Sequence, residues 1–127
     1  MNDPEIERIM REKMKKLMQS NIRIVDINGD NMHLLLSEKP IIVDFWAPWC
    51  APCKYMHSIF ERLASRYGDK IRFARVNVDE NQLLAVKYEI TAIPTLLLLI
   101  DGRIVERVIG LKSENELDGI IRRYIKE

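Results

Sequence analysis

Hydrophobic residues along this 127-residue chain repeat with two different periods. Two runs, at residues 41–46 and 95–100, are apolar at both parities of a two-residue period, which predicts strands buried on both faces. Residues 22–27 alternate apolar and polar side chains and predict a half-buried strand. We also expect a strand at 71–78 and an antiparallel edge strand at 103–109.

Between these strands, apolar residues fall at helical spacing. The helices predicted this way lie at residues 3–19, 31–37, 51–67, 81–88 and 113–125. The short helix at 31–37 is expected to turn Met32, Leu35 and Leu36 inward. The order is therefore one helix followed by βαβαβαββα. Asp101-Gly102 is predicted to be a two-residue hairpin turn between the last two strands. Helices between the early strands and a hairpin near the end predict an α/β fold, with a mixed sheet covered on both faces.

The first helix is predicted to be an extension, residues 1–20, ahead of a domain at 21–127. Asp3 can cap it and Pro4 suits its first position. Its apolar stripe consists of Ile6, Ile9, Met10, Met14, Leu17 and Met18. We expect this stripe to pack on the chain's own domain. A contact with a partner or a second copy is the alternative, because methionine-rich faces suit adaptable contacts.

Composition narrows the possible functions. The chain is long enough for one domain with one core, and its net charge of +1 gives no reason to expect a nucleic-acid partner. The sequence contains neither a secretory signal nor an apolar stretch long enough to span a membrane. The chain has only two cysteines, and both belong to the candidate reactive pair described next, so none is left for a structural disulfide. This favours a reducing, cytoplasmic location.

The chain's only two cysteines, Cys50 and Cys53, stand where the strand at 41–46 passes into a helix. A helix N-terminus favours an anion, because its first N–H groups are unpaired and its dipole is positive there. Pro52 fits the first turn, where an N–H is not needed. We therefore predict that Cys50 is the exposed thiolate nucleophile. Cys53, one turn deeper, would resolve the mixed disulfide and leave a Cys50–Cys53 bridge.

Other uses of two cysteines fit this sequence less well. A structural disulfide across three residues would close almost no loop. A zinc site needs about four ligands, and the only histidines are His33 and His57. Haem attachment would need histidine directly after Cys53, where the chain has Lys54. We expect neither a metal nor an organic cofactor.

The run Asp44–Lys54 resembles the active site of the thioredoxin family, with Ala51 where that family usually has glycine. Four more motifs of the family follow in order: Asn77-Val78-Asp79, Ile93-Pro94-Thr95, Asp101-Gly102 and Gly110. The resemblance covers about residues 21–127. It implies the thioredoxin fold and a general protein-disulfide reductase.

A carboxylate at Asp44, inside a buried strand, is costly unless it pairs or keeps its proton, and burial raises its pKa. The resemblance implies that Asp44 lies behind the second cysteine and assists its deprotonation. Arg75 takes the place of a family lysine near this aspartate and would lower its pKa on contact.

His57 stands where the family usually has a small apolar residue. We favour a partly buried histidine with a carboxylate or backbone partner, the alternative being proton exchange with Cys53 or Asp44. Lys54 is a cation in the first turn and is expected to be solvated, the alternative being a role in steering substrates.

The resemblance also implies a docking surface for substrates. Trp49 would border the reactive cysteine with an apolar face. Pro94 would be a cis-proline that turns the backbone of Ile93 toward an extended substrate segment. Gly110 would allow the substrate to approach closely.

Two other functions stay open. Oxidases and isomerases of this family typically carry histidine between the cysteines, and Ala51-Pro52 contains none, so a reductase is favoured. A scaffold subunit or a cluster-binding module is the other alternative. As a reductase, the chain would be a monomer that takes electrons from a thioredoxin reductase and passes them to disulfide-containing target proteins.

Overall fold

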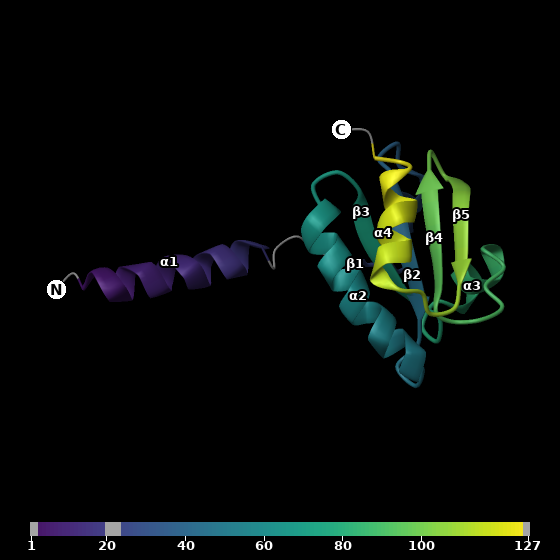
Figure 1. Ribbon diagram of the computed structural model, residues 1–127. Helices are drawn as coiled ribbons and strands as arrows, with labels where there is room; N and C mark the ends of the chain where they lie inside the picture. The colour runs from purple at the N-terminus through teal and green to yellow at the C-terminus, as the bar shows by residue number, and fades with distance from the viewer. Residues whose placement is uncertain (1–2, 20–23, 126–127) are drawn as a thin grey trace.

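The computed structural model describes residues 3–19 and 24–125 (Figure 1). Its centre is a five-stranded sheet in the order β1-β3-β2-β4-β5. The strands are β1 (Ile24–Asp26), β2 (Ile41–Trp46), β3 (Arg72–Asn77), β4 (Thr95–Ile100) and β5 (Arg103–Ile109). The first three are parallel to one another, whereas β4 and β5 run antiparallel to their neighbours. The predicted mixed sheet is therefore confirmed.

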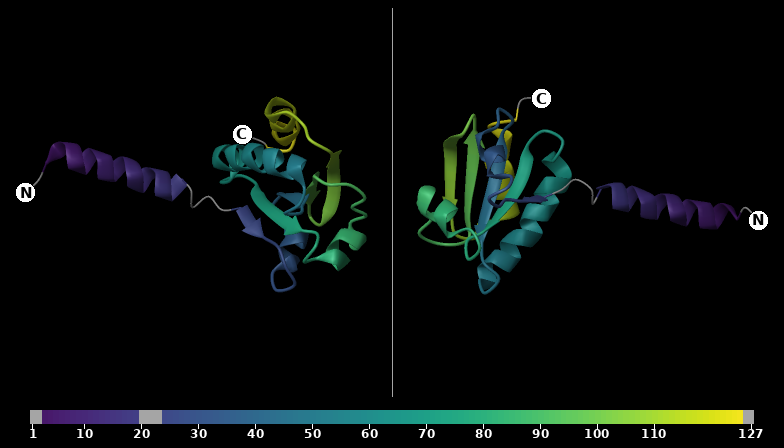
Figure 2. Two further views of the ribbon diagram at one scale, coloured as in Figure 1. Left: turned by 90° about the horizontal axis from the view of Figure 1, so that it is seen from below. Right: turned by 180° about the vertical axis from the view of Figure 1, so that it is seen from behind.

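Helices cover both faces of this sheet (Figure 2). On one face lie α2 (Ala51–Tyr67) and α4 (Glu114–Arg122). On the other lie the 3₁₀ helix η1 (Met32–Leu36) and α3 (Gln82–Lys87). Two buried apolar clusters fill the two interfaces, because side chains alternate between the faces along each strand. The α/β architecture predicted from periodicity is thus the one observed.

This alternation decides which polar side chains point toward α2. On β2, Ile42 packs among residues of α2 and α4, and its neighbour Ile41 packs on the opposite face. Asp44 and Trp46 share the parity of Ile42, and on β3, Arg75 shares that of Phe73, which lies in the same cluster. These three polar or amphipathic side chains therefore face the helix that begins at the cysteines.

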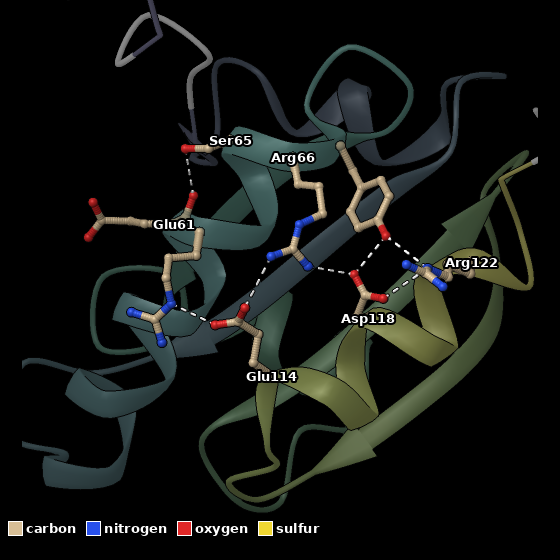
Figure 3. A network of polar contacts seen from close by, with 8 residues as sticks. Glu61, Ser65, Arg66, Glu114, Asp118 and Arg122 are labelled. Carbon is tan, nitrogen blue, oxygen red and sulfur yellow. Dashed lines mark hydrogen bonds and ion pairs between the residues drawn. The ribbon is translucent and has the colours of Figure 1, made fainter. Parts of the chain in front are cut away.

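Helices α2 and α4 are also joined by a polar network at the surface (Figure 3). Arg66 donates to Asp118 at 2.7 Å and to Glu114 at 3.2 Å. The Tyr67 hydroxyl also donates to Asp118, at 2.6 Å, and Arg122 pairs with that carboxylate at 2.9 Å. Because the network links α2 to a helix about fifty residues later, it holds the helix of the redox pair against the C-terminal part of the chain.

The hairpin between β4 and β5 has the predicted two-residue turn. Asp101 has φ 52° and Gly102 has φ 77°. Positive φ at both positions matches the twist of the flanking strands. A Cβ on Gly102 would lie 3.1 Å from the side chain of Leu36.

Two predictions about local packing are wrong. In η1, only Leu35 is buried, whereas Met32 and Leu36 are exposed. A 3₁₀ helix has three residues per turn, so Leu36 lies about a third of a turn away from the inward-facing Leu35. The first helix, α1 (Pro4–Gln19), forms as predicted, and Asp3 caps it through the N–H of Glu5.

However, α1 does not pack on its own domain. The described part of its stripe, Ile6, Ile9, Met10 and Met14, is exposed, and in Figures 1 and 2 the helix extends away from the sheet. Leu17 and Met18 belong to α1, but the structure does not describe their side chains. The predicted boundary between residues 20 and 21 and residues 22–23 of the first predicted strand lie outside the described residues.

Candidate functional site

The two cysteines meet at the N-terminus of α2. Cys50 is the N-cap residue, and its sulfur accepts the N–H of Cys53 at 3.2 Å. Pro52 sits in the first turn of the 17-residue helix, as the sequence predicted. The two sulfurs form a disulfide, with the Cα atoms 5.3 Å apart. The positive end of the helix and the donated N–H both stabilise negative charge on the Cys50 sulfur.

Neither cysteine is openly exposed in the oxidised pair. Cys50 is 5% exposed and Cys53 is 1% exposed. The sequence analysis predicted an exposed Cys50, and it therefore overstated the difference in solvent exposure between Cys50 and Cys53. The cause is that Ala47, Trp46 and Ile93 pack around both cysteines.

The loop before β4 forms one wall of the site. The peptide bond between Ile93 and Pro94 is cis, as the family resemblance implied. The carbonyl oxygen of Ile93 lies 3.9 Å from the Cys50 sulfur. Gly110 has φ 89° and donates its N–H to the carbonyl of Pro94 at 2.8 Å. A Cβ at Gly110 would meet no atom within 4 Å, so its positive φ, rather than crowding, favours glycine there.

Beside this wall lies an open, apolar groove of about 440 Å³. Its lining consists of Trp49, Val78, Ala85 and residues 90–93. Trp49 is 71% exposed, and its indole N–H donates to the Asp79 carboxylate at 3.0 Å. Sequence reasoning gave Asp79 no role. The available signal was its place in the Asn77-Val78-Asp79 motif. This hydrogen bond orients the indole beside the redox pair.

Asp44 lies on the sheet face under α2 and is completely buried. Arg75 is its partner across the β2–β3 pairing, and the guanidinium Nε lies 3.4 Å from Asp44 Oδ2. The other oxygen, Oδ1, has no hydrogen-bond partner among the described residues. Burial raises the pKa of Asp44 from 3.8 to about 6, and the opposing effect of Arg75 keeps it from rising further. A carboxyl with this pKa can exchange a proton near neutral pH.

His57 and Lys54, both on α2, do not line the groove beside Trp49. They line a second pocket, of about 180 Å³, together with Trp46, Pro48, Cys53 and Arg75. Lys54 is exposed, as expected, and the His57 ring has the expected carboxylate partner, with Nε2 2.8 Å from Oε1 of Glu61. Arg75 stacks on Trp46 at 4.0 Å from the ring centroid. The structure thus brings Lys54, His57 and Arg75 to one pocket at Cys53.

Within residues 3–19 and 24–125, no helix is long and apolar enough to cross a bilayer. The same residues include no group of three or more His, Cys, Asp or Glu side chains placed to hold a metal ion.

Comparison with known proteins gives a consistent result. A family model described as Thioredoxin matches residues 23–123. The thioredoxin of Bacillus subtilis (strain 168) is 43% identical over 102 residues, which is 80% of this chain and 98% of that protein. The thioredoxin of Griffithsia pacifica is 38% identical over 90 residues, or 71% of this chain and 83% of that protein.

Solved structures agree with the sequence relatives. A mutant thioredoxin from Halobacterium salinarum NRC-1 superposes with a TM-score of 0.76 at 32% identity, covering 84% of this chain and 94% of that one. The Malassezia sympodialis thioredoxin gives a TM-score of 0.73 at 31% identity, covering 80% and 90%.

Proposed function

Since this chain belongs to the thioredoxin family, we propose that Cys50 attacks protein disulfides and that Cys53 resolves the product. The family match and the Cys50–Cys53 pair make the chain a thiol–disulfide oxidoreductase that reduces protein disulfides.

One observation supports Cys50 as the nucleophile: it is the cysteine at the N-cap of α2, with the N–H of Cys53 on its sulfur. Cys53 lies within the helix and is the more buried of the two. A thiolate is the reactive form of cysteine, and a helix N-terminus lowers a thiol pKa. The charge is therefore better stabilised on Cys50 than on Cys53.

The reaction then balances in two exchanges. The Cys50 thiolate attacks one sulfur of the target disulfide, the target S–S bond breaks, and the second target sulfur leaves as a thiolate. Cys53 gives up its proton and attacks Cys50, which forms the Cys50–Cys53 bond and releases the first target sulfur. Two electrons pass from the enzyme dithiol to the target, and the two target thiolates take up protons.

Asp44 is the proposed acceptor of the Cys53 proton. Its complete burial and its pKa of about 6 support this role, because a carboxylate and a carboxylic acid are both accessible near neutral pH. Arg75 shares the role by holding one carboxylate oxygen and leaving Oδ1 free to accept.

Targets are proposed to dock on the groove beside Trp49. The cis bond at Pro94 and the turn at Gly110 leave the backbone of Ile93 at the edge of this groove, next to Cys50. An extended target segment could pair with that backbone and place an apolar side chain against the indole. We further propose that a thioredoxin reductase supplies the electrons, and that the chain works as a cytoplasmic monomer.

The test is insulin reduction by dithiothreitol, followed by turbidity, with the wild type, Cys50→Ser and Cys53→Ser. Both variants should lose the acceleration. Only Cys53→Ser should accumulate a mixed disulfide with the target, visible as an added mass without reductant. Trapping by Cys50→Ser instead would reverse the assignment, and the two variants serve as controls for each other.

A potential titration separates the reductase from the oxidase alternative. A value near the thioredoxin example of about −270 mV is expected, and one of about −180 mV or higher would favour an oxidase or isomerase. A visible chromophore in freshly purified protein would favour the cluster-binding alternative.

A further inference from the structure

Cys53 can be reached through a pocket that the docking groove does not share. This pocket, of about 180 Å³, is lined by Trp46, Pro48, Cys53, Lys54, His57 and Arg75, and none of these residues lines the groove beside Trp49. A water molecule occupies about 30 Å³ of liquid, so the pocket has room for a few. A target docked on the groove need not contact any residue that lines this second approach to Cys53.

A proton must enter or leave the buried side of the redox pair in every turnover, because Cys53 alternates between thiol and disulfide. Cys53 is 1% exposed and Asp44 is 0% exposed. A carboxyl without solvent contact can accept the thiol proton but cannot release it to solvent unaided. The protein therefore needs a group that reaches both the buried side and the solvent.

Three buried polar atoms near this pocket have no hydrogen-bond partner among the described residues: Asp44 Oδ1, Trp46 Nε1 and His57 Nδ1. Trp46 and His57 line the pocket, and Asp44 precedes Trp46 by two residues on the same face of β2. Buried polar atoms in native proteins are normally satisfied, often by internal water. Internal water that satisfied these three atoms would form a polar path from the carboxyl to the imidazole.

The His57 ring is held in the orientation that such a path requires. Its Nε2 lies 2.8 Å from the Glu61 carboxylate, one turn further along α2. A hydrogen bond from Nε2–H to that carboxylate assigns the lone pair of the neutral ring to Nδ1. The Nδ1 atom is buried, yet the side chain as a whole is 34% exposed. His57 therefore reaches from the pocket to the solvent.

We propose that His57 is the proton relay between the buried side of the redox pair and solvent, with Glu61 as the residue that positions its ring. This rests on the proposed function of Cys50, Cys53 and Asp44. As Cys53 attacks Cys50, its proton passes to the Asp44 carboxylate and on to His57 Nδ1 through water in the pocket. The imidazolium then loses a proton to bulk water on its exposed side and returns to the neutral form. No electrons move in the relay, and reduction of the disulfide runs it in reverse.

The charges around His57 suit this task. Burial lowers the pKa of His57, and the positive charge of Arg75 on β3 lowers it further. Glu61 on the same helix and Asp26 on β1 act in the opposite direction. Asp44 on β2 is paired with Arg75, and Lys54, which is exposed, lines the same pocket as His57. The ring is consequently neutral at physiological pH and can accept a proton.

The chain provides a matched control, because its only other histidine, His33, is exposed in η1 on the opposite face of the sheet. The test compares His57→Gln with His33→Gln in single-turnover reduction of a disulfide peptide between pH 5.5 and 8.5. Glutamine keeps a hydrogen-bonding side chain but cannot carry a proton. His57→Gln should slow the reduction near pH 7 by about tenfold, less than a primary general base contributes, and should change the shape of the pH profile.

His33→Gln should match the wild type in both rate and profile. In Asp44→Asn, adding His57→Gln should cause no further loss, because the two residues act in one path. His57→Ala should be restored by added imidazole. Glu61→Gln, which is exposed and leaves the core intact, should also slow the reduction and should lower the His57 pKa seen by NMR.

Two results would overturn the relay. One is an unchanged rate and pH profile in His57→Gln. The other is an equal loss at every pH without rescue of His57→Ala by imidazole, which would mean a structural role. Alkylation of reduced Cys50 should proceed at the wild-type rate in all histidine variants. If the wild type itself failed to reduce the peptide, the proposed function would fail and not only the relay.

Discussion

Replacing Asp44 by asparagine is expected to make this protein more stable and less active. The carboxyl is completely buried, and burial raises its pKa from 3.8 to about 6. At neutral pH the folded protein must therefore hold a charge that its surroundings disfavour. Asparagine has nearly the same shape and carries no charge, so the variant avoids this cost.

The magnitude follows from the pKa difference. A folded value of about 6 lies about 2.2 above 3.8, and each pKa unit corresponds to about 1.36 kcal/mol. Between pH 3.8 and about 6 the unfolded chain loses this proton while the folded chain keeps it, so the free energy of unfolding falls as the pH rises. Above that window the loss is complete, at about 3 kcal/mol.

The pH dependence isolates this contribution from the rest of the substitution. At low pH the wild type has a neutral Asp44 beside Arg75, and so resembles the variant. The difference in the free energy of unfolding should therefore be small near pH 3.5 and should grow to about 3 kcal/mol at pH 7, with Asp44→Asn the more stable.

Urea unfolding of the oxidised proteins at several pH values, followed by tryptophan fluorescence and circular dichroism, measures this difference. Asp30→Asn removes an exposed carboxylate and should change the free energy of unfolding by less than about 0.5 kcal/mol. Parallel curves of unfolding free energy against pH for Asp44→Asn and the wild type from pH 3.5 to 7, or a less stable variant at pH 7, would contradict a cost of burying the Asp44 charge.

Three further predictions concern other residues. Glu89→Gly should raise the free energy of unfolding by about 1 kcal/mol in urea titration, because Glu89 has φ 54°, where a Cβ is strained; a loss of stability would contradict this. Arg75→Leu should raise the pKa of Asp44 above about 6 in a carbon-13 NMR titration, because the guanidinium now lowers it, and an unchanged value would show that the pair contributes nothing. Asp118→Asn should lower the melting temperature at pH 7, because the hydrogen bond from Tyr67 lowers the pKa of Asp118. Calorimetry should show the difference shrinking as the pH falls below 3.8, since stabilisation from a lowered pKa is lost on protonation.

Local patterns were enough to predict most of the elements and the position of the cysteines. The run at 41–46 is buried along both faces, and Cys50 is the N-cap of the helix that follows. The hairpin at Asp101-Gly102 also formed where its two residues predicted it. Each of these features depends on residues within one or two turns of each other, and such short-range preferences are written directly in the order of side chains.

Packing between distant segments was harder to predict from the sequence. Sequence reasoning placed Leu36 inside, but the backbone of η1 forms a 3₁₀ turn that directs it outward. It also placed the stripe of α1 against the domain, yet the stripe is exposed. An amphipathic pattern states that one face is apolar and does not state what covers it.

The proton chemistry of the site shows the same division. The sequence alone determined that a dithiol stands at a helix N-terminus and that a carboxylate lies in the strand before it. The tertiary structure decided that Arg75 faces Asp44, because the register of β2 against β3 pairs residues 31 positions apart. It also decided that His57 presents a buried nitrogen to the pocket at Cys53. A pKa depends on the burial and charges around a group, and only the folded chain brings those neighbours together.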